Sequence, residues 1–220
     1  MEQHKSGCAV HHSDSLFGEI LAHLPYAIFS VAFGLTILSV MDYFTGGASK
    51  KGAKLLFHSF HFLHLIFAVT GSLITFSRFS NNLAKGIVVS LVSAVVFCTL
   101  SDVVMPALFV KALGVDVHLH LCFISELHNV IPFLAIGLLN GIVMSYHSHS
   151  AREFYSVTSH FSHILVSSLA SLFYLISHGF IEWYENLGLL YILLILAVVI
   201  PCTMADIVVP VFFARSGKKV

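Results

Sequence analysis

The sequence predicts an all-α polytopic membrane protein with six transmembrane helices. Of its 220 residues, 57% are hydrophobic and only 10% are charged, and the mean hydropathy is +0.91. A soluble domain has about a quarter of its residues charged. Apolar stretches of about 20 or more residues recur along the chain, and each can cross a hydrocarbon core of ~30 Å as a helix.

The loops between the apolar stretches are short, so we expect one integral membrane domain preceded by a polar N-terminal segment at 1–15. That segment shows no charged region leading into a short apolar run with a cleavage site, so no removable signal peptide is expected. Nucleic acid is not an expected partner, because the net charge is zero and no basic face is evident. The expected helices are 16–43, 55–77, 86–112, 121–146, 154–180 and 187–213.

The distribution of Lys and Arg predicts the orientation, since basic loops favour the cytoplasmic side. An even number of helices places both termini on one side. We therefore expect a multi-pass protein of the inner or plasma membrane with cytoplasmic termini. The terminal side carries Lys5, Arg78, Lys85, Arg152, Arg215, Lys218 and Lys219, and the other side carries Lys50, Lys51, Lys54 and Lys111.

Two patterns recur about a hundred residues apart and predict an internal repeat. The segment "CTLSDVVMP" at 98–106 returns as "CTMADIVVP" at 202–210, and "HFLH" at 61–64 matches "HFSH" at 160–163. Residues 16–112 and 121–213 are therefore expected to be two copies of a three-helix unit. Because three is odd, the second copy enters the membrane from the opposite side. Such inverted repeats are typical of secondary transporters, whose sites lie near the midplane between the halves.

Four of the fifteen histidines form the matched pairs of this repeat. The i, i+3 spacing puts His61 and His64 on one helix face, and likewise His160 and His163. Histidines in apolar helices also serve as hydrogen-bonding contacts between helices. Two matched pairs beside matched aspartates favour metal binding over that structural role. Cys98 and Cys202 are expected to pack as small apolar side chains.

Each aspartate of the repeat is followed by a proline four residues on, Asp102 by Pro106 and Asp206 by Pro210. A helical proline has no N–H for the carbonyl four residues back. We therefore expect the backbone carbonyls of both aspartates to be free, so that each residue offers a carboxylate and a carbonyl to a cation. A charge at the bilayer centre costs at least ~2.5–3.5 kcal/mol, which favours a functional role over a simple kink.

Other polar residues extend the expected site. Glu126 and His128 begin the helix expected at 121–146, and they are interpreted as a gate or a second site. Being two residues apart, they point to different helix faces. A cytoplasmic group of histidines would add a loose metal-capturing surface and favours export. That group is His4, His11, His12, His147 and His149.

Two short segments resemble families of metal transporters. "LSDVVMPALF" resembles a Ser-Asp-x-x-x-Pro segment of multi-spanning heavy-metal exporters of the manganese type, although those exporters are longer, with more helices. "LHNVIP" resembles the His-Asn and Pro segment of ZIP-type zinc transporters, but Phe133 stands where that family has glutamate. The first resemblance implies a metal substrate.

The resulting hypothesis is a secondary transporter of a divalent transition-metal ion working by alternating access. Imidazole and carboxylate without a thiolate cluster suit zinc, iron or manganese rather than Cu⁺. Protons are the expected coupling ion, because neutral His and ionised Asp are the metal-binding forms. The metal is then the substrate rather than a resident cofactor, and no residue is assigned a catalytic role. The other expected partners are the lipid bilayer and, since six-helix bundles often dimerise, a second copy of the chain. The expected ligands are His61, His64, Asp102, Glu126, His128, His160, His163 and Asp206.

Two enzyme classes remain as alternatives. A b-type cytochrome would use His64 and His163 as axial haem ligands. A metal-dependent membrane oxidoreductase, such as a di-iron hydroxylase, needs HxxxH and HxxHH boxes. "HSFHFLH" at 58–64 does not supply them.

Overall fold

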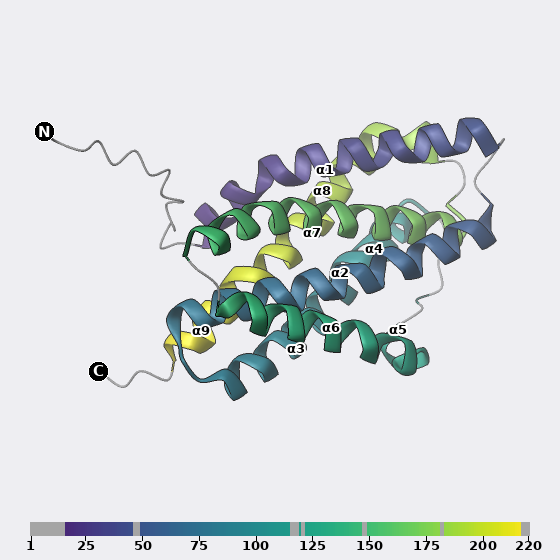
Figure 1. Cartoon of the computed structure of the whole chain (residues 1–220). Coiled ribbons are helices and arrows are strands. Elements are labelled where there is room, and N and C mark those ends of the chain that lie inside the picture. Colours follow the sequence, from purple (N-terminus) through teal and green to yellow (C-terminus); the bar gives the residue numbers. More distant parts are fainter. Residues whose placement is uncertain are drawn as a thin grey trace, which may run out of the picture.

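The computed structural model describes residues 16–45, 49–114, 119, 122–146, 149–180 and 183–216, and every regular element among them is helical. The predicted N-terminal segment, with His4, His11 and His12, lies outside the described residues, as do His147 and the side chain of His149. The all-α prediction is confirmed for the part of the chain that the structure describes. Its arrangement is shown in Figure 1.

Six helices within the described residues are long and apolar enough to span a membrane, as the sequence predicts. Large apolar side chains such as Phe29, Val92 and Leu139 are exposed on the outer faces of these helices, and many serines are buried together with the apolar core. Such a surface suits contact with lipid, and the length and composition of the six helices are those of a multi-pass membrane protein. The spans are His23–Thr45, Lys50–Phe79, Leu83–Ala112, Leu127–Ser145, His160–Ser177 and Trp183–Arg215.

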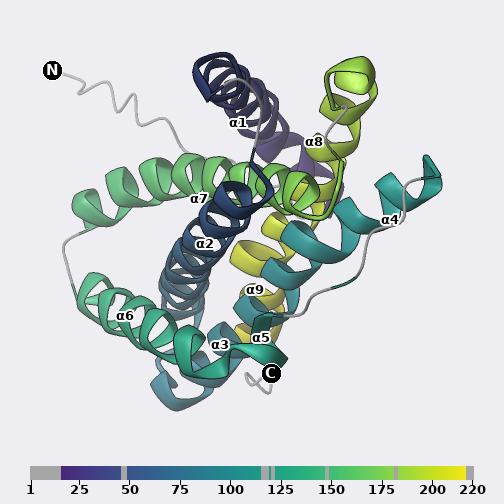
Figure 2. The same ribbon diagram turned by 90° about the vertical axis from the view of Figure 1, so that its right-hand side faces the viewer.

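Helices α2 (Lys50–Phe79) and α7 (His149–Ser177) form the centre of the bundle. They run antiparallel, and α1 (Leu16–Thr45) packs on α7 and on α8 (Leu187–Thr203), while α6 (Leu127–Ser145) packs on α2 (Figures 1 and 2). The starts of α1 and α7 and the end of α9 (Val209–Arg215) lie at one end of the bundle (Figure 1). The side of the membrane that this end faces stays a prediction, and so does the repeat.

Two spans contain a π-helical turn in the middle. The third span consists of α3 (Leu83–Thr99), η1 (Leu100–Val104) and α4 (Met105–Ala112). The sixth consists of α8, η3 (Met204–Val208) and α9, after the 3₁₀ turn η2 (Trp183–Asn186). Each π-turn holds one of the intramembrane aspartates and ends just before a proline. Such turns occur mostly as single-turn bulges at functional sites.

The fourth span begins later than the sequence predicts. The short helix α5 (Cys122–Ser125) ends at Glu126, which caps the start of α6 with non-helical backbone angles. The expected single helix at 121–146 is therefore interrupted. Glu126 lies in the break and His128 in the first turn of α6.

Helix α6 approaches α2 closely because of two glycines on one face. A Cβ atom at Gly137 would lie 3.0 Å from the backbone oxygen of Ile66, and one at Gly141 would lie 3.1 Å from a side-chain atom of Leu73. The hydroxyl of Thr70 donates a hydrogen bond to the Gly137 carbonyl at 3.0 Å. Small residues four apart are a common way for membrane helices to approach each other, and here they serve a contact within the chain.

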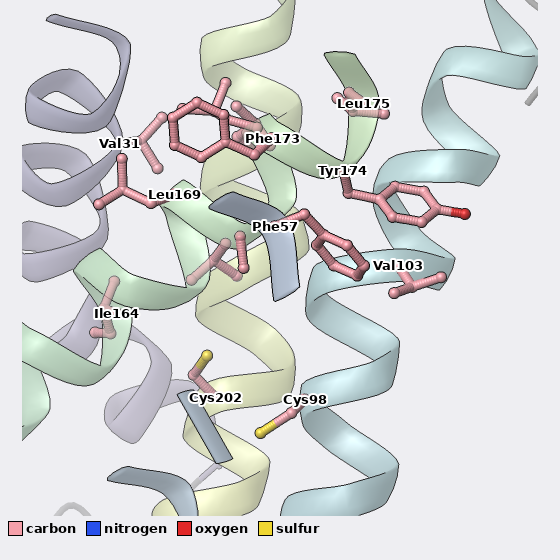
Figure 3. Close-up of a cluster of buried hydrophobic side chains, with 14 of the residues drawn as sticks. Val31, Phe57, Cys98, Val103, Ile164, Leu169, Phe173, Tyr174, Leu175 and Cys202 are labelled. Carbon is pink, nitrogen blue, oxygen red and sulfur yellow. The ribbon is translucent and has the colours of Figure 1, made fainter. Parts of the chain in front are cut away.

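The core between α2, α7 and the broken helices has an apolar layer beside a polar one. Phe57, Val103 and Tyr174 pack together in the apolar layer, and Cys98 and Cys202 lie on neighbouring helices next to it (Figure 3). The ring centroids of Phe57 and Tyr174 are 5.1 Å apart. The polar layer continues from the two cysteines and contains the paired histidines and aspartates.

Candidate metal centre

Asp102 is completely buried, and both of its carboxylate oxygens have hydrogen-bond partners. Oδ2 accepts from Nδ1 of His61 at 2.8 Å and from Nδ1 of His64 at 2.7 Å. Oδ1 accepts from the hydroxyls of Ser101 and Ser167, each at 2.7 Å. Four donors from η1, α2 and α7 therefore hold this carboxylate, which removes most of the cost of placing it among apolar helices.

Asp206 is held by fewer partners. Its Oδ2 accepts from Nδ1 of His163 at 2.6 Å and lies 3.9 Å from Nε2 of His160. Its Oδ1 is buried and has no hydrogen-bond partner. Gly71 of α2 lies against this carboxylate, where a Cβ atom would come within 3.1 Å of Oδ1. The glycine provides the space that the aspartate occupies.

The π-turns determine which carbonyls lose the N–H donor that each proline lacks. The N–H of Met105 donates to Leu100, and that of Val209 donates to Met204, both in the i→i+5 register. In this register the prolines leave the carbonyls of Ser101 and Ala205 without an N–H donor.

Serine side chains replace the missing donors at both carbonyls. Ser171 donates to the carbonyl of Ser101 and Ser93 to that of Ala205, each at 3.1 Å. These two carbonyls therefore serve helix packing, and the expected free carbonyls of the aspartates stay a prediction.

The two aspartate–histidine pairs converge on one point. A carboxylate only accepts hydrogen bonds when ionised, so His64 and His163 donate from Nδ1 and turn their Nε2 lone pairs away from the aspartates. Nε2 of His64 lies 3.7 Å from Sγ of Cys202, and Nε2 of His163 has no hydrogen-bond partner. One ligand atom from each of His64, His163 and Cys202 lies within 4.8 Å of the others.

This geometry fits a transition-metal ion. A tetrahedral zinc ion with bonds of ~2.0–2.1 Å to nitrogen and ~2.3 Å to sulfur separates those atoms by roughly 3.6 Å, close to the 3.7 Å between Nε2 of His64 and Sγ of Cys202. Metal-bound histidines commonly donate their other N–H to a carboxylate, which fixes the ring. Asp102 and Asp206 occupy that orienting position. The three ligand residues are nearly inaccessible to solvent.

Cys202 is the residue of this group that the sequence reasoning assigned to apolar packing. Its position in the repeated "CT" pattern, four residues before Asp206, is the signal that could have identified it. Cys98, the equivalent residue of the first pattern, is buried and interacts electrostatically with His64. A thiol at this point changes the expected ligand chemistry from nitrogen and oxygen to nitrogen and sulfur.

The other expected site residues lie outside this group of three. Glu126 is next to His58, with 3.2 Å between its Oε1 and Nε2 of the imidazole, and it also accepts from the side chain of Asn129. His128 is exposed at the start of α6. His61 is buried and donates a hydrogen bond to Asp102. The ring of His160 packs against that of His23, with 5.1 Å between the ring centroids.

The pairing of Glu126 with His58 has no signal in the sequence, because the break before α6 that turns the glutamate towards α2 is not apparent there. Ser101, Ser167 and Gly71 were missed for a similar reason. Each acts through a contact between separate helices, or through a π-turn, that helical spacing does not specify.

No family model, curated protein or solved structure matches this chain. The two short resemblances to metal transporters therefore place it in no family. What stands is a chain with six helices long and apolar enough to cross a membrane and a buried group of two histidines and one cysteine that could hold a metal ion.

Proposed function

We propose that this protein transports a divalent transition-metal ion across the membrane, with His64, His163 and Cys202 as the central ligands. The observation that carries the proposal is the convergence of two aspartate-bound histidines, from the antiparallel helices α2 and α7, on one cysteine sulfur. A doubly charged ion at this point also offsets two carboxylates that are buried in an apolar bundle.

Polar residues continue from the centre towards both ends of the bundle, as a transport path requires. His61, His58 and Glu126 follow towards the start of α2, and His160 and His23 follow towards the start of α7. The two helices start at opposite ends of the bundle (Figure 1). The buried centre then corresponds to an occluded state between two access routes.

The ligand chemistry favours zinc among the divalent ions. Thiolate and imidazole suit Zn²⁺ and softer ions, whereas Mn²⁺ prefers oxygen ligands. In this arrangement the carboxylates orient the histidines and do not bind the ion directly. Manganese, which the sequence hypothesis included, becomes the least favoured of the three expected metals.

A haem between His64 and His163 fits this geometry poorly. Axial imidazoles bind a haem iron from opposite faces, through metal–nitrogen bonds of ~2 Å each. The distance between their ring centroids is therefore the sum of these two bonds and of half the width of each ring. The ring centroids here are only 4.5 Å apart. One metal ion bound by both Nε2 atoms on the same side agrees better with the separation.

A metal-dependent membrane enzyme is the second candidate, because three protein ligands leave a fourth position open on a tetrahedral ion. Catalytic zinc sites use that open position for water or substrate. The two candidates differ in whether the ion leaves the protein during turnover, which a flux measurement detects.

The test is metal flux into proteoliposomes that contain the purified chain and a zinc-sensitive dye. We expect saturable Zn²⁺ flux in the wild type and loss of at least about 100-fold in His163→Ala and Cys202→Ala, since a direct ligand matters more than a residue that orients one.

Cys122→Ser is the matched control for the cysteine variant. Burial raises the pKa of the Cys122 thiol to about 12, so it stays protonated at neutral pH and is a poor ligand. Bound zinc without flux in the wild type would favour the enzyme, and normal flux in both ligand variants would contradict the central site.

A further inference from the structure

The end of the bundle where α1 and α7 begin contains a second group of potential ligands. Nε2 of His160 lies 3.9 Å from Oδ2 of Asp206, and the ring of His23 lies 5.1 Å from that of His160 at an interplanar angle of 53°. His23 also interacts electrostatically with Asp206. Neither histidine belongs to the central group of His64, His163 and Cys202.

The separation between His160 and Asp206 suits a bridging ion better than a hydrogen bond. A distance of 3.9 Å is too long for an N–H···O hydrogen bond. Two donors bound to one zinc ion at up to ~2.1 and ~2.2 Å can be at most about 4.3 Å apart. An ion between these two side chains needs little movement, whereas His23 must come closer to complete the site, because the ligand atoms of the three residues are not as close together as those of the central group.

Asp206 has an oxygen that its known contacts do not use. Its side chain is about 5% exposed and Oδ1 has no hydrogen-bond partner, while Oδ2 accepts from His163. A buried acceptor without a partner is costly and requires an explanation, such as an ion. Asp102 supplies the contrast, because its equivalent oxygen is bound by two serine hydroxyls.

We propose that His23, His160 and the carboxylate of Asp206 form a second metal site, for a divalent ion of the zinc or iron type. Two histidines and one carboxylate are a common ligand set for Fe²⁺ and Zn²⁺. The site lies between the central ligands and the end of the bundle where α1 begins. This inference rests on the proposed transport and assigns the site the role of a staging position through which the ion enters or leaves the centre.

Asp206 connects the two sites physically. The same carboxylate orients His163 of the central group through Oδ2, the oxygen that also lies nearest His160, while Oδ1 has no hydrogen-bond partner. An ion at the second site competes with His163 for this carboxylate and thereby loosens a central ligand.

The test counts ions bound to the full-length chain in nanodiscs, after removal of metal by a chelator, with Zn²⁺ for stoichiometry and Co²⁺ for spectroscopy. A thiolate ligand gives Co²⁺ a near-ultraviolet charge-transfer band, which of the two proposed sites the central one produces, through Cys202. We expect two ions per wild-type chain and one in His160→Ala and in His23→Ala, with the band retained. The double variant His64→Ala, Cys202→Ala should keep one ion and lose the band.

His178→Ala is the matched control, because this histidine lies at the other end of α7 and its Nδ1 donates to the carbonyl of Tyr174 at 2.8 Å. It should keep two ions and the band. A wild type that saturates at one ion with the band, unchanged in His160→Ala, would refute the second site and leave the proposed transport intact. Loss of the band in His160→Ala would refute an independent second site, and a wild type that binds no ion would refute both proposals.

Discussion

The surroundings of Asp102 and Asp206 differ although the two residues occupy the same position in the same sequence pattern. Asp102 accepts four hydrogen bonds, two from histidines and two from serines. Asp206 accepts one, from His163, and keeps one oxygen without a partner. The difference arises at one neighbouring position of the pattern, where Ser101 corresponds to Ala205, and at Ser167 of α7. One aspartate is therefore fixed by its neighbours, while the other is available to a further ligand.

The largest difference in stability is expected when each aspartate carboxylate is removed in turn. In Asp102→Ala, two histidines and two serines lose a buried acceptor, and we expect a loss of roughly 3–5 kcal/mol in the free energy of unfolding. In Asp206→Ala only His163 loses a hydrogen bond, so we expect about 1–3 kcal/mol. Thermal unfolding in detergent, followed by circular dichroism, measures both. Equal losses would contradict the comparison.

If the serine contacts cause the difference between the two aspartates, removing a serine beside Asp102 should destabilise the protein, and adding one beside Asp206 should stabilise it. Ser167→Ala removes a hydrogen bond of 2.7 Å to a buried carboxylate, which should cost about 1.5–3 kcal/mol. Ala205→Ser places a hydroxyl in the second π-turn where Ser101 stands in the first, and should stabilise the protein by about 1 kcal/mol. The same unfolding measurement applies, and destabilisation by Ala205→Ser would show that the second turn has no room for the hydroxyl.

Gly71 tests the position of the Asp206 carboxylate without changing its chemistry. In Gly71→Ala the new Cβ would lie 3.1 Å from Oδ1, so the carboxylate must shift and His163 must follow it. We expect zinc affinity to fall roughly tenfold, as for other changes to groups that orient a ligand. Gly52→Ala is the control, since the nearest contact of its Cβ would be at 3.9 Å. Competition with a zinc-binding dye measures both.

The smallest effects are expected where the two halves are alike. Ser171 and Ser93 each donate to a carbonyl that a proline leaves without an N–H donor, at the same distance of 3.1 Å. Ser171→Ala and Ser93→Ala should each lower the free energy of unfolding by about 1 kcal/mol. Hydrogen–deuterium exchange in the two π-turns should rise to a similar degree. A large difference between the variants would mean that only one of these carbonyls depends on its serine.

Composition and hydropathy were sufficient to predict six membrane-spanning helices, because the length of an apolar run directly reflects the thickness of the bilayer. The histidine pairs and aspartates were also identifiable, since buried ionisable residues are rare in such helices. The prolines correctly indicated irregular backbone next to Asp102 and Asp206. They did not reveal the i→i+5 register, so the serine-bound carbonyls of Ser101 and Ala205 were not expected.

The roles of the individual groups could not be predicted from spacing. Whether Asp102 binds an ion or orients His64 depends on which imidazole nitrogen faces it, and only the packing of α2 against η1 fixes this. Cys202 joins the histidines because the end of α8 packs against α7, and η3, which follows it, packs against α2. No local pattern specifies that packing. Glu126 and His128 were assigned to the site on proximity in the sequence, and their different surroundings follow from the break before α6.

Each π-turn also has a consequence for the outer surface of its helix. A turn closed by i→i+5 hydrogen bonds contains one residue more than an α-helical turn, so in evolutionary terms it corresponds to a single-residue insertion. Every residue after it is rotated by about 100° around the helix axis relative to an uninterrupted α-helix. The lipid-facing positions of α4 and α9 are therefore out of phase with those of α3 and α8. A related chain that lacked Val103 or Ile207 would turn a different set of side chains towards the lipid.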